Sequence, residues 1–216
     1  MAKVIVSYVW ELPVRMTHWV NALCIFTLCI TGFFIGSPVS LGDNPSQFVM
    51  GWFRFVHFVA GYTFAISVLS RVYWSIVGNE YASWRVFFPW FTPEGRREMY
   101  AVFSWYVFLN RKVPRELGTN AMAAFVYFFA FLLYLLLIAT GFALYVQYTS
   151  HTVLNFMFGW ITLVIPSQWV RMVHHFSMYF LIGFVINHIY SGSLVDTKSK
   201  GGVISSIFSG YKAGPE

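Results

Sequence analysis

Charged residues are scarce in this sequence. Asp, Glu, Lys and Arg make up 10% of its 216 residues and hydrophobic residues 58%, whereas soluble proteins contain about 25% charged residues. This scarcity excludes a soluble globular domain. Apolar stretches recur along most of the chain, which also excludes a protein with a single anchor. The formal net charge of +6 does not require a nucleic-acid partner, because excess Lys and Arg orient membrane proteins in the bilayer.

Cysteine is almost absent. Cys24 and Cys29 both lie in the first apolar stretch, and their spacing points them to different sides of a helix. The sequence has no C-x-x-C-H motif and no cysteine cluster, which excludes covalent haem attachment and an iron–sulfur cluster. The first residues also lack a basic segment leading directly into an apolar core, so we expect no cleaved signal and a first span that directs its own insertion.

The apolar stretches predict an all-α integral membrane protein, an up-and-down bundle of four transmembrane helices, because about 20 apolar residues cross a bilayer. We expect a single membrane domain over residues 1–216. The expected spans are residues 17–36, 50–77, 121–146 and 170–193. Within the connection 80–120, a helix that begins at Pro93 has a polar first turn and an aromatic remainder, which predicts that it lies along the membrane surface.

Basic residues are distributed unevenly between the two sides of this topology. Lys3, Arg15, the six basic residues of the connection 80–120 and three lysines after residue 196 fall on one side, and only Arg54 and Arg171 fall on the other. The positive-inside rule therefore places both termini in the cytoplasm. We expect a multi-pass protein of a bacterial or archaeal inner (cytoplasmic) membrane.

Four of the six histidines lie at helix positions that match in depth. His174 and His188 are 14 residues apart in the last span, so they lie within about 40° of one helix face and ~21 Å apart. His57 opens the second span on the outer side, and His18 opens the first span on the cytoplasmic side. The topology thus pairs His57 with His174, and His18 with His188.

Two pairs of facing imidazoles in a helix bundle are the arrangement that holds two six-coordinate haem irons. A single histidine in a span is explained equally well as a core side chain that forms a hydrogen bond with a carbonyl group. Two depth-matched pairs are hard to explain in that way. His175 is an alternative to His174, although its 13-residue offset from His188 turns it ~140° away on an ideal helix. His151 lies in the outer connection, and we interpret it as a surface residue.

Arginines follow the same pattern. Arg15, Arg54 and Arg171 each precede a paired histidine by three residues, which places a guanidinium group one turn nearer the water, where it suits a haem propionate. Arg71 follows His57 by 14 residues and reaches the depth of the inner pair. The alternative is that arginines at helix edges extend to the surface, which fits Arg15 best.

The sequence resembles the b-type cytochrome subunit of membrane-bound nickel–iron (uptake) hydrogenases, a di-haem cytochrome b family related to the membrane subunits of respiratory formate dehydrogenases. The resemblance covers nearly the whole chain. It rests on YVWELPVRMTHW (8–19), FVHFVAG (55–61), RVYWSIVGN (71–79), ATGFALY (139–145), the His174/His188 pair and GYK (210–212).

The resemblance implies two haem b groups, with outer ligands His57 and His174 and inner ligands His18 and His188. It implies that electrons pass from the iron–sulfur small subunit of a nickel–iron hydrogenase, whose large subunit holds the metal centre, to a quinone (menaquinone or ubiquinone) near the cytoplasmic haem. Arg15, Arg71 and Tyr190 are candidates for the neighbourhood of that quinone. Such a chain is an electron-transfer subunit of an oxidoreductase complex in a respiratory chain and not a complete enzyme alone.

Three other interpretations remain. An equivalent quinone-reducing subunit of a formate dehydrogenase or thiosulfate reductase would share the haems and differ in its partner. A histidine-based proton relay or transporter would usually show discontinuous helices or acidic residues within its spans, and none of the expected spans contains Asp or Glu. A passive membrane anchor would have no use for two histidine pairs.

Overall fold

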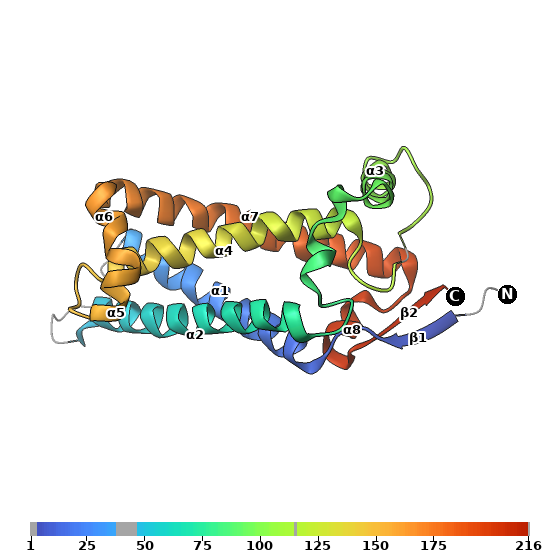
Figure 1. Ribbon diagram of the computed structural model, residues 1–216. Coiled ribbons are helices and arrows are strands. Elements are labelled where there is room, and N and C mark those ends of the chain that lie inside the picture. The colour runs from blue at the N-terminus through green and yellow to red at the C-terminus, as the bar shows by residue number, and fades with distance from the viewer. Residues whose placement is uncertain (1–3, 38–46, 115, 216) are drawn as a thin grey trace. The chain divides into compact units, whose positions relative to one another are not determined.

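A computed structural model describes residues 4–37, 47–114 and 116–215. Most of the chain in these ranges is helical, and its course can be followed in Figure 1. Residues 38–46, between the first two expected spans, and Arg115 lie outside the described residues.

Four helices within the described residues are long and apolar enough to cross a membrane. They are α1 (Leu12–Gly36), α2 (Val49–Val77), α4 (Ala121–Tyr145) and α7 (Ser167–Ser199). The predicted fold class is therefore confirmed. The ends of α2 and α4 lie within one residue of the expected spans, whereas α1 begins five residues earlier and α7 extends beyond its expected span at both ends.

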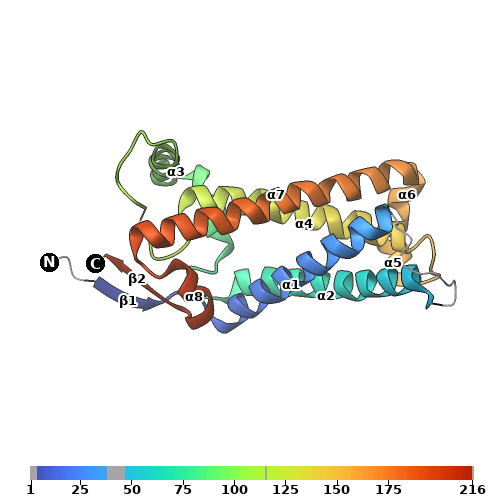
Figure 2. The same cartoon turned by 180° about the vertical axis from the view of Figure 1, so that it is seen from behind.

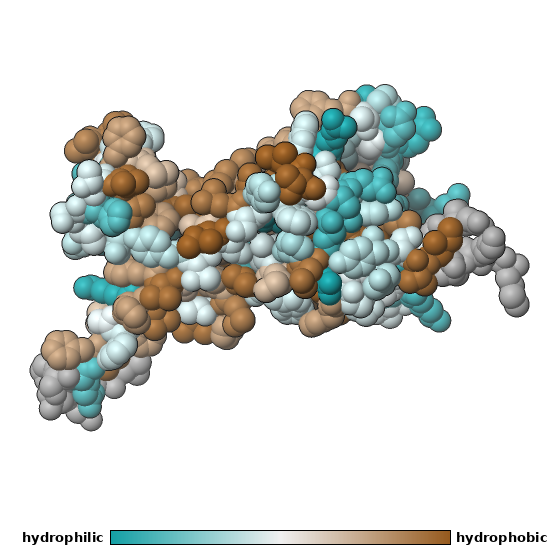
Figure 3. Space-filling model, turned by 60° about the horizontal axis from the view of Figure 1, so that its bottom comes forward, coloured by the Kyte–Doolittle hydropathy of each residue, from teal (hydrophilic) through white to brown (hydrophobic). Residues whose placement is uncertain are grey.

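These segments are helices because a helix satisfies every backbone donor and acceptor within itself, as a bilayer requires. Their outward side chains are apolar. Phe26 on α1, Leu69 on α2, Leu132 on α4 and Phe180 on α7 are all exposed, and hydrophobic residues cover much of the face drawn in Figure 3. Exposed apolar surface of this extent is what lipid chains cover in an integral membrane protein.

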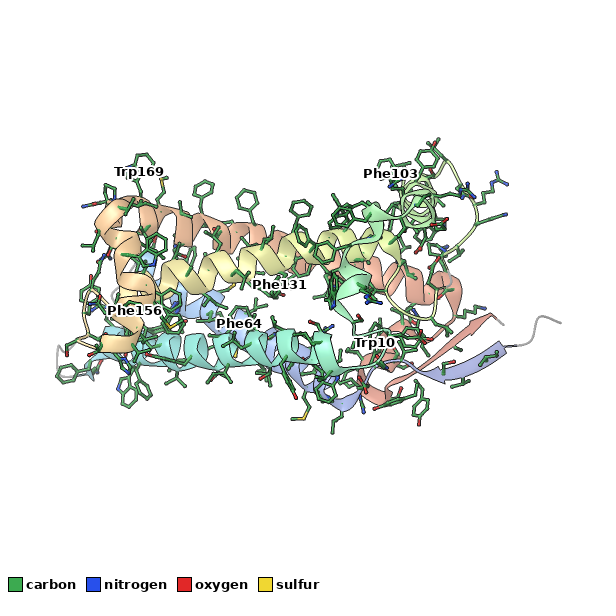
Figure 4. The ribbon with its side chains drawn as sticks, in the orientation of Figure 1. Trp10, Phe64, Phe103, Phe131, Phe156 and Trp169 are labelled. Atoms are coloured by element: carbon green, nitrogen blue, oxygen red, sulfur yellow. The ribbon has the colours of Figure 1, made fainter. Side chains whose placement is uncertain are left out.

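The chain forms two compact units, each of which contains part of all four long helices. Unit 1 comprises Met1–Trp19, Leu69–Phe131 and Phe184–Glu216, and unit 2 comprises Val20–Val68 and Leu132–Gly183. In unit 2, Phe64 of α2 is 3% exposed and meets the ring of Tyr134 of α4 edge to face, with ring centres 5.1 Å apart. Figure 4 shows Phe64 on the inner side of α2.

Unit 1 contains a β-ribbon that was not predicted from the sequence. Strands β1 (Val4–Tyr8) and β2 (Tyr211–Pro215) pair antiparallel, so that Tyr8 lies opposite Tyr211, and both views show the two strands side by side (Figures 1 and 2). The short helix α8 (Val203–Ser209) precedes β2. Trp10 Nε1 donates to Ser206 Oγ of α8 at 3.1 Å, which ties the start of the first span to the segment after the last span.

The connection between α2 and α4 contains two short 3-10 turns, Trp84–Phe87 and Pro89–Phe91, followed by helix α3 (Pro93–Tyr106). The predicted helix is thus present. Its first turn is capped by Thr92, whose hydroxyl accepts from Gly95 N at 3.1 Å. Tyr100 and Phe103, three residues apart on this helix, are both exposed, and Phe103 is labelled in Figure 4. This is the pattern of a helix that lies in a membrane interface.

The connection between α4 and α7 is also helical. It consists of α5 (Thr152–Leu154), the π-helical turn Asn155–Gly159 and α6 (Trp160–Val164). Phe156 and Leu163 are more than four-fifths exposed, so this connection presents an apolar surface. His151, at its start, is exposed as expected.

Candidate haem-ligand pairs

Unit 2 brings the rings of His57 of α2 and His174 of α7 close together. Their ring centres are 6.4 Å apart and their ring planes differ by 71°. Both side chains are half-buried. The two residues that the topology paired near the outer side are therefore neighbours in the structure.

Each of these histidines contacts a Thr-Gly dipeptide (the Thr-Gly step) of a neighbouring helix. Thr31 Oγ1 of α1 lies 2.8 Å from His57 Nδ1, and Thr140 Oγ1 of α4 lies 2.8 Å from His174 Nδ1. The glycines that follow, Gly32 and Gly141, leave room for the rings, because a Cβ there would lie 3.2 Å and 3.1 Å from the Cε1 atoms of His57 and His174. Neither threonine was predicted from the sequence, although the repeated letters TGF at 31–33 and 140–142 were a usable signal.

His175 occupies a different environment from His174. Its ring lies against Gly36 at the end of α1, where a Cβ would come within 2.6 Å of its Cε1 atom. Its Nε2 lies 3.5 Å from the hydroxyl of Tyr179, one turn further along α7. The residue opposite His57 is thus His174, as the angles on an ideal helix favoured.

Unit 1 brings together the second pair. The ring centres of His18 on α1 and His188 on α7 are 6.0 Å apart, with planes that differ by 52°. His188 Nδ1 lies 3.2 Å from the hydroxyl of Tyr127 on α4, and its ring stacks on Phe184 with an interplanar angle of 17°. His18 Nδ1 is buried and has no hydrogen-bond partner among the described residues.

The two arginines expected near the inner pair are half-buried in the same unit. Arg15 donates through Nη1 to the carbonyl of Phe208, and Arg71 donates through Nη2 to the carbonyl of Ala82 at 3.1 Å. Each keeps a second nitrogen, Arg15 Nε and Arg71 Nη1, that is buried without a partner in the part of the chain that the structure describes. Both guanidinium groups therefore have capacity left for an acidic group.

The outer arginines differ from each other. Arg171 is exposed and donates through Nη2 to the hydroxyl of Tyr148 at 2.6 Å, with its guanidinium carbon 6.0 Å from the centre of that ring. Arg54 is exposed on the first turns of α2. Tyr190, considered for a quinone site, is 63% exposed on α7.

The residues of both pairs fit an iron porphyrin. Two imidazoles on opposite sides of one metal ion hold their ring centres about 6 Å apart, because each nitrogen–metal bond is about 2 Å and each ring centre lies about 1 Å behind its nitrogen. The observed 6.4 Å and 6.0 Å agree with this value. Gly61, one turn after His57, has no described atom within 4 Å of where its Cβ would lie, so the helix face beside the ligand is open.

No metal site with three or more protein ligands is found in the part of the chain that the structure describes. Within residues 4–37, 47–114 and 116–215, no three His, Cys, Asp or Glu side chains are grouped so that they could hold a metal ion. Two imidazoles are enough for a haem iron, since the porphyrin fills the other four positions. The free nitrogens of Arg15 and Arg71 suit the propionates of such a group.

Comparison with known proteins identifies the family of this chain. A family model described as prokaryotic cytochrome b561 matches residues 9–210. The chain is 43% identical to the probable Ni/Fe-hydrogenase B-type cytochrome subunit of Cupriavidus necator, over 95% of this chain and 86% of that protein. It is 39% identical to the protein of that name from Rhizobium leguminosarum, over 95% and 88% of the two chains.

A more distant relative covers even more of both chains. The probable Ni/Fe-hydrogenase 1 B-type cytochrome subunit of Escherichia coli K12 is 34% identical over 98% of this chain and 92% of its own length. The match of the family model and these full-length similarities show that the chain belongs to the prokaryotic cytochrome b561 family, the b-type cytochromes that bind haem b.

Proposed function

We propose that this chain is the di-haem, membrane-embedded electron carrier of a nickel–iron hydrogenase. It receives electrons from the complex's iron–sulfur subunit on the outer side of the membrane and delivers them to a quinone near the cytoplasmic side. The observation that supports this proposal most directly is the pair of bis-histidine contacts, at ring separations of 6.4 Å and 6.0 Å. Their α7 members, His174 and His188, are 14 residues apart on one helix.

The chain's own residues have three tasks in this function. His57 with His174, and His18 with His188, hold iron between their rings. Arg15 and Arg71 bind propionates at the inner pair through the nitrogens that protein groups leave free. The apolar helices exclude water around both pairs, which keeps the site at low dielectric. When bound, haem b supplies a one-electron carrier at each pair.

The choice of partner rests on the relatives. The proteins from Cupriavidus necator, Rhizobium leguminosarum and Escherichia coli are all named as B-type cytochrome subunits of a Ni/Fe hydrogenase. We therefore infer that this chain assembles with the small iron–sulfur and large nickel–iron subunits of such an enzyme. Catalysis of hydrogen oxidation belongs to those subunits, and this chain contributes quinone reduction.

We assign the quinone to the neighbourhood of the inner pair because three polar side chains that could bind it belong to the same unit as that pair. The half-buried Arg15 and Arg71 lie in the same unit as His18 and His188, and Tyr190 follows His188 by two residues. A quinone takes up two electrons and two protons on reduction, so a site on the cytoplasmic side would draw those protons from the cytoplasm.

The first test is a reduced-minus-oxidised spectrum of the purified protein, together with a pyridine haemochrome count per chain. A b-type spectrum with two haems per chain is the expected result. One haem would mean that one pair holds no iron, and protein without haem would contradict the proposal and return the histidines to a proton-relay or structural role. Co-purification of a hydrogenase small subunit would separate the hydrogenase complex from a formate dehydrogenase or thiosulfate reductase.

A further inference from the structure

The outer histidine pair is supported by a structural motif that occurs twice. Thr31-Gly32-Phe33 lies on α1 and Thr140-Gly141-Phe142 on α4. In each case the threonine hydroxyl lies 2.8 Å from Nδ1 of one outer histidine. The following glycine lies against Cε1 of the same ring.

The hydrogen bonds of these threonines bear on which histidine nitrogen carries a proton. Thr31 Oγ1 lies 2.7 Å from the carbonyl of Thr27, and Thr140 Oγ1 lies 2.6 Å from the carbonyl of Leu136. A carbonyl oxygen only accepts, so the single hydroxyl hydrogen points at it. With its hydrogen directed at that carbonyl, the hydroxyl oxygen can accept from the histidine, which corresponds to a proton on Nδ1 of His57 and of His174.

This protonation leaves Nε2 of each ring with a free electron pair, which is the state that binds a metal ion. The glycine completes the constraint, because its helix backbone lies against Cε1, the ring atom bonded to Nδ1, while the threonine hydroxyl contacts Nδ1 itself. The Thr-Gly step therefore fixes both the tautomer and the orientation of each outer ring.

The inner pair is held differently. His188 Nδ1 meets the phenol of Tyr127 at the longer distance of 3.2 Å. His18 Nδ1 has no partner among the described residues. Both outer Nδ1 atoms thus have a hydroxyl oxygen at 2.8 Å, whereas the inner pair has one such contact, at 3.2 Å.

We propose that Thr31 and Thr140 are positioning residues that lower the reduction potential of the iron held by His57 and His174 relative to the iron held by His18 and His188. A hydrogen bond from Nδ1 makes an imidazole a more basic ligand. A more basic ligand stabilises ferric over ferrous iron, which is one of the means by which a protein sets haem potential. The inference rests on the proposed di-haem function, and it gives electrons a downhill direction from the outer to the inner site.

The test is a spectroscopically monitored redox titration of the purified full-length protein, without quinone or hydrogenase. Thr31→Val and Thr140→Val keep the side-chain shape and remove the hydroxyl oxygen, and Thr31→Ser and Thr140→Ser restore it. His174 also has a backbone hydrogen bond with Leu137, so the Thr31 variants give the cleaner test. The His57→Ala spectrum identifies which component belongs to the outer site. Thr63→Val is a matched control, since the Thr63 hydroxyl bonds the carbonyl of Val59 within α2 in the same manner and is exposed.

We expect the valine variants to raise the midpoint potential of the outer component alone, the serine variants to return it towards the wild-type value, and Thr63→Val to leave both components unchanged. If a valine variant loses the outer haem while the serine variant retains it, the hydroxyl is needed for ligand positioning, which also supports the proposal.

Two results would overturn the inference. One is an unshifted outer potential in valine variants that retain both haems. The other is equal haem loss in the valine and serine variants, because packing volume and not the hydroxyl would then matter. These results differ from failure of the proposed function, in which the wild-type protein itself contains no haem.

Discussion

Gly32 and Gly141 lie where a single methyl group would press on a ligand ring. Replacing a glycine within a helix by alanine favours the helix by about 1 kcal/mol. At these two positions the added Cβ would lie 3.2 Å and 3.1 Å from a histidine carbon, so the ring must move. Helix stability and haem binding should therefore change in opposite directions.

We predict that Gly32→Ala and Gly141→Ala reduce the outer haem content or shift its spectrum, and leave the inner haem in place. Gly51→Ala is the control, since its Cβ would meet only Phe48 Cβ at 3.8 Å. The haem count per chain and the low-temperature absorbance bands are the measurements. Variants that keep two unshifted haems would show that the rings are not seated against these glycines.

His18→Ala or His188→Ala should remove the inner haem and abolish quinone reduction, while the outer haem is still reduced by the electron donor. The physical reason is that each iron depends on two imidazoles, and the two pairs share no histidine. The test is to measure the haem count and the rate of quinone reduction on the same preparation of each variant. Quinone reduction that persists after demonstrated loss of the inner haem would disprove the assigned electron path.

At the scale of elements, α3 is joined to α4 by a carboxylate. Glu98 Oε1 of α3 accepts from the backbone N–H of Ala121 at 2.7 Å and so caps the first turn of α4. Burial is the main cause that raises the pKa of the Glu98 carboxyl, the hydrogen bond from Ala121 lowers it, and the nearby Glu116 raises it further. The net direction is upward from 4.5.

A raised pKa in the folded protein means that the folded state binds more protons than the unfolded state. The free energy of unfolding should therefore fall as pH rises from 4.5 through the raised pKa of Glu98. We predict that Glu98→Gln, which retains an accepting oxygen, flattens this slope in thermal unfolding measured in detergent. The exposed Glu94→Gln of the same helix should keep it, and identical slopes in all three proteins would refute the assignment.

The long helices could be predicted from sequence because their signal is local. An uninterrupted apolar stretch of about 20 residues is recognisable by itself, and the expected ends of α2 and α4 differ from the structure by at most one residue. The β-ribbon could not be predicted in this way. Its strands are five residues each and are separated in sequence by all four spans, so neither stretch shows its partner.

The pairing of the histidines could be predicted from the sequence, but the contacts that Thr31 and Thr140 make with them could not. Depth in the membrane follows from counting residues along each helix, which was enough to match His18 with His188 and His57 with His174. The contacts of Thr31 and Thr140 depend on how each helix is rotated about its axis, and a uniformly apolar helix gives little periodicity from which to read that rotation.

At the scale of the whole molecule, the β-ribbon requires the segment before the first span and the segment after the last span to be on the same side of the membrane. This agrees with an even number of spans. The excess of Lys and Arg in the connection 80–120 and after residue 196 predicts that this side is the cytoplasm.

Labelling with a membrane-impermeant maleimide tests this orientation. In a background with Cys24 and Cys29 replaced by serine, the exposed positions Ser150→Cys and Ser205→Cys report on opposite sides. We predict that Ser150→Cys reacts in spheroplasts and Ser205→Cys reacts only in inverted vesicles. The reverse pattern would place the inner pair of histidines on the outer side and invert the proposed direction of electron flow.

The β-ribbon also sets an order of assembly. A ribosome makes β1 before the four spans and β2 after them, so during synthesis β1 is an open strand edge that awaits a partner about 200 residues away in sequence. Unpaired edges attract other strands. Pairing of β2 with β1 removes that edge only once α7 has been made, so the ribbon forms after the four spans have been synthesised.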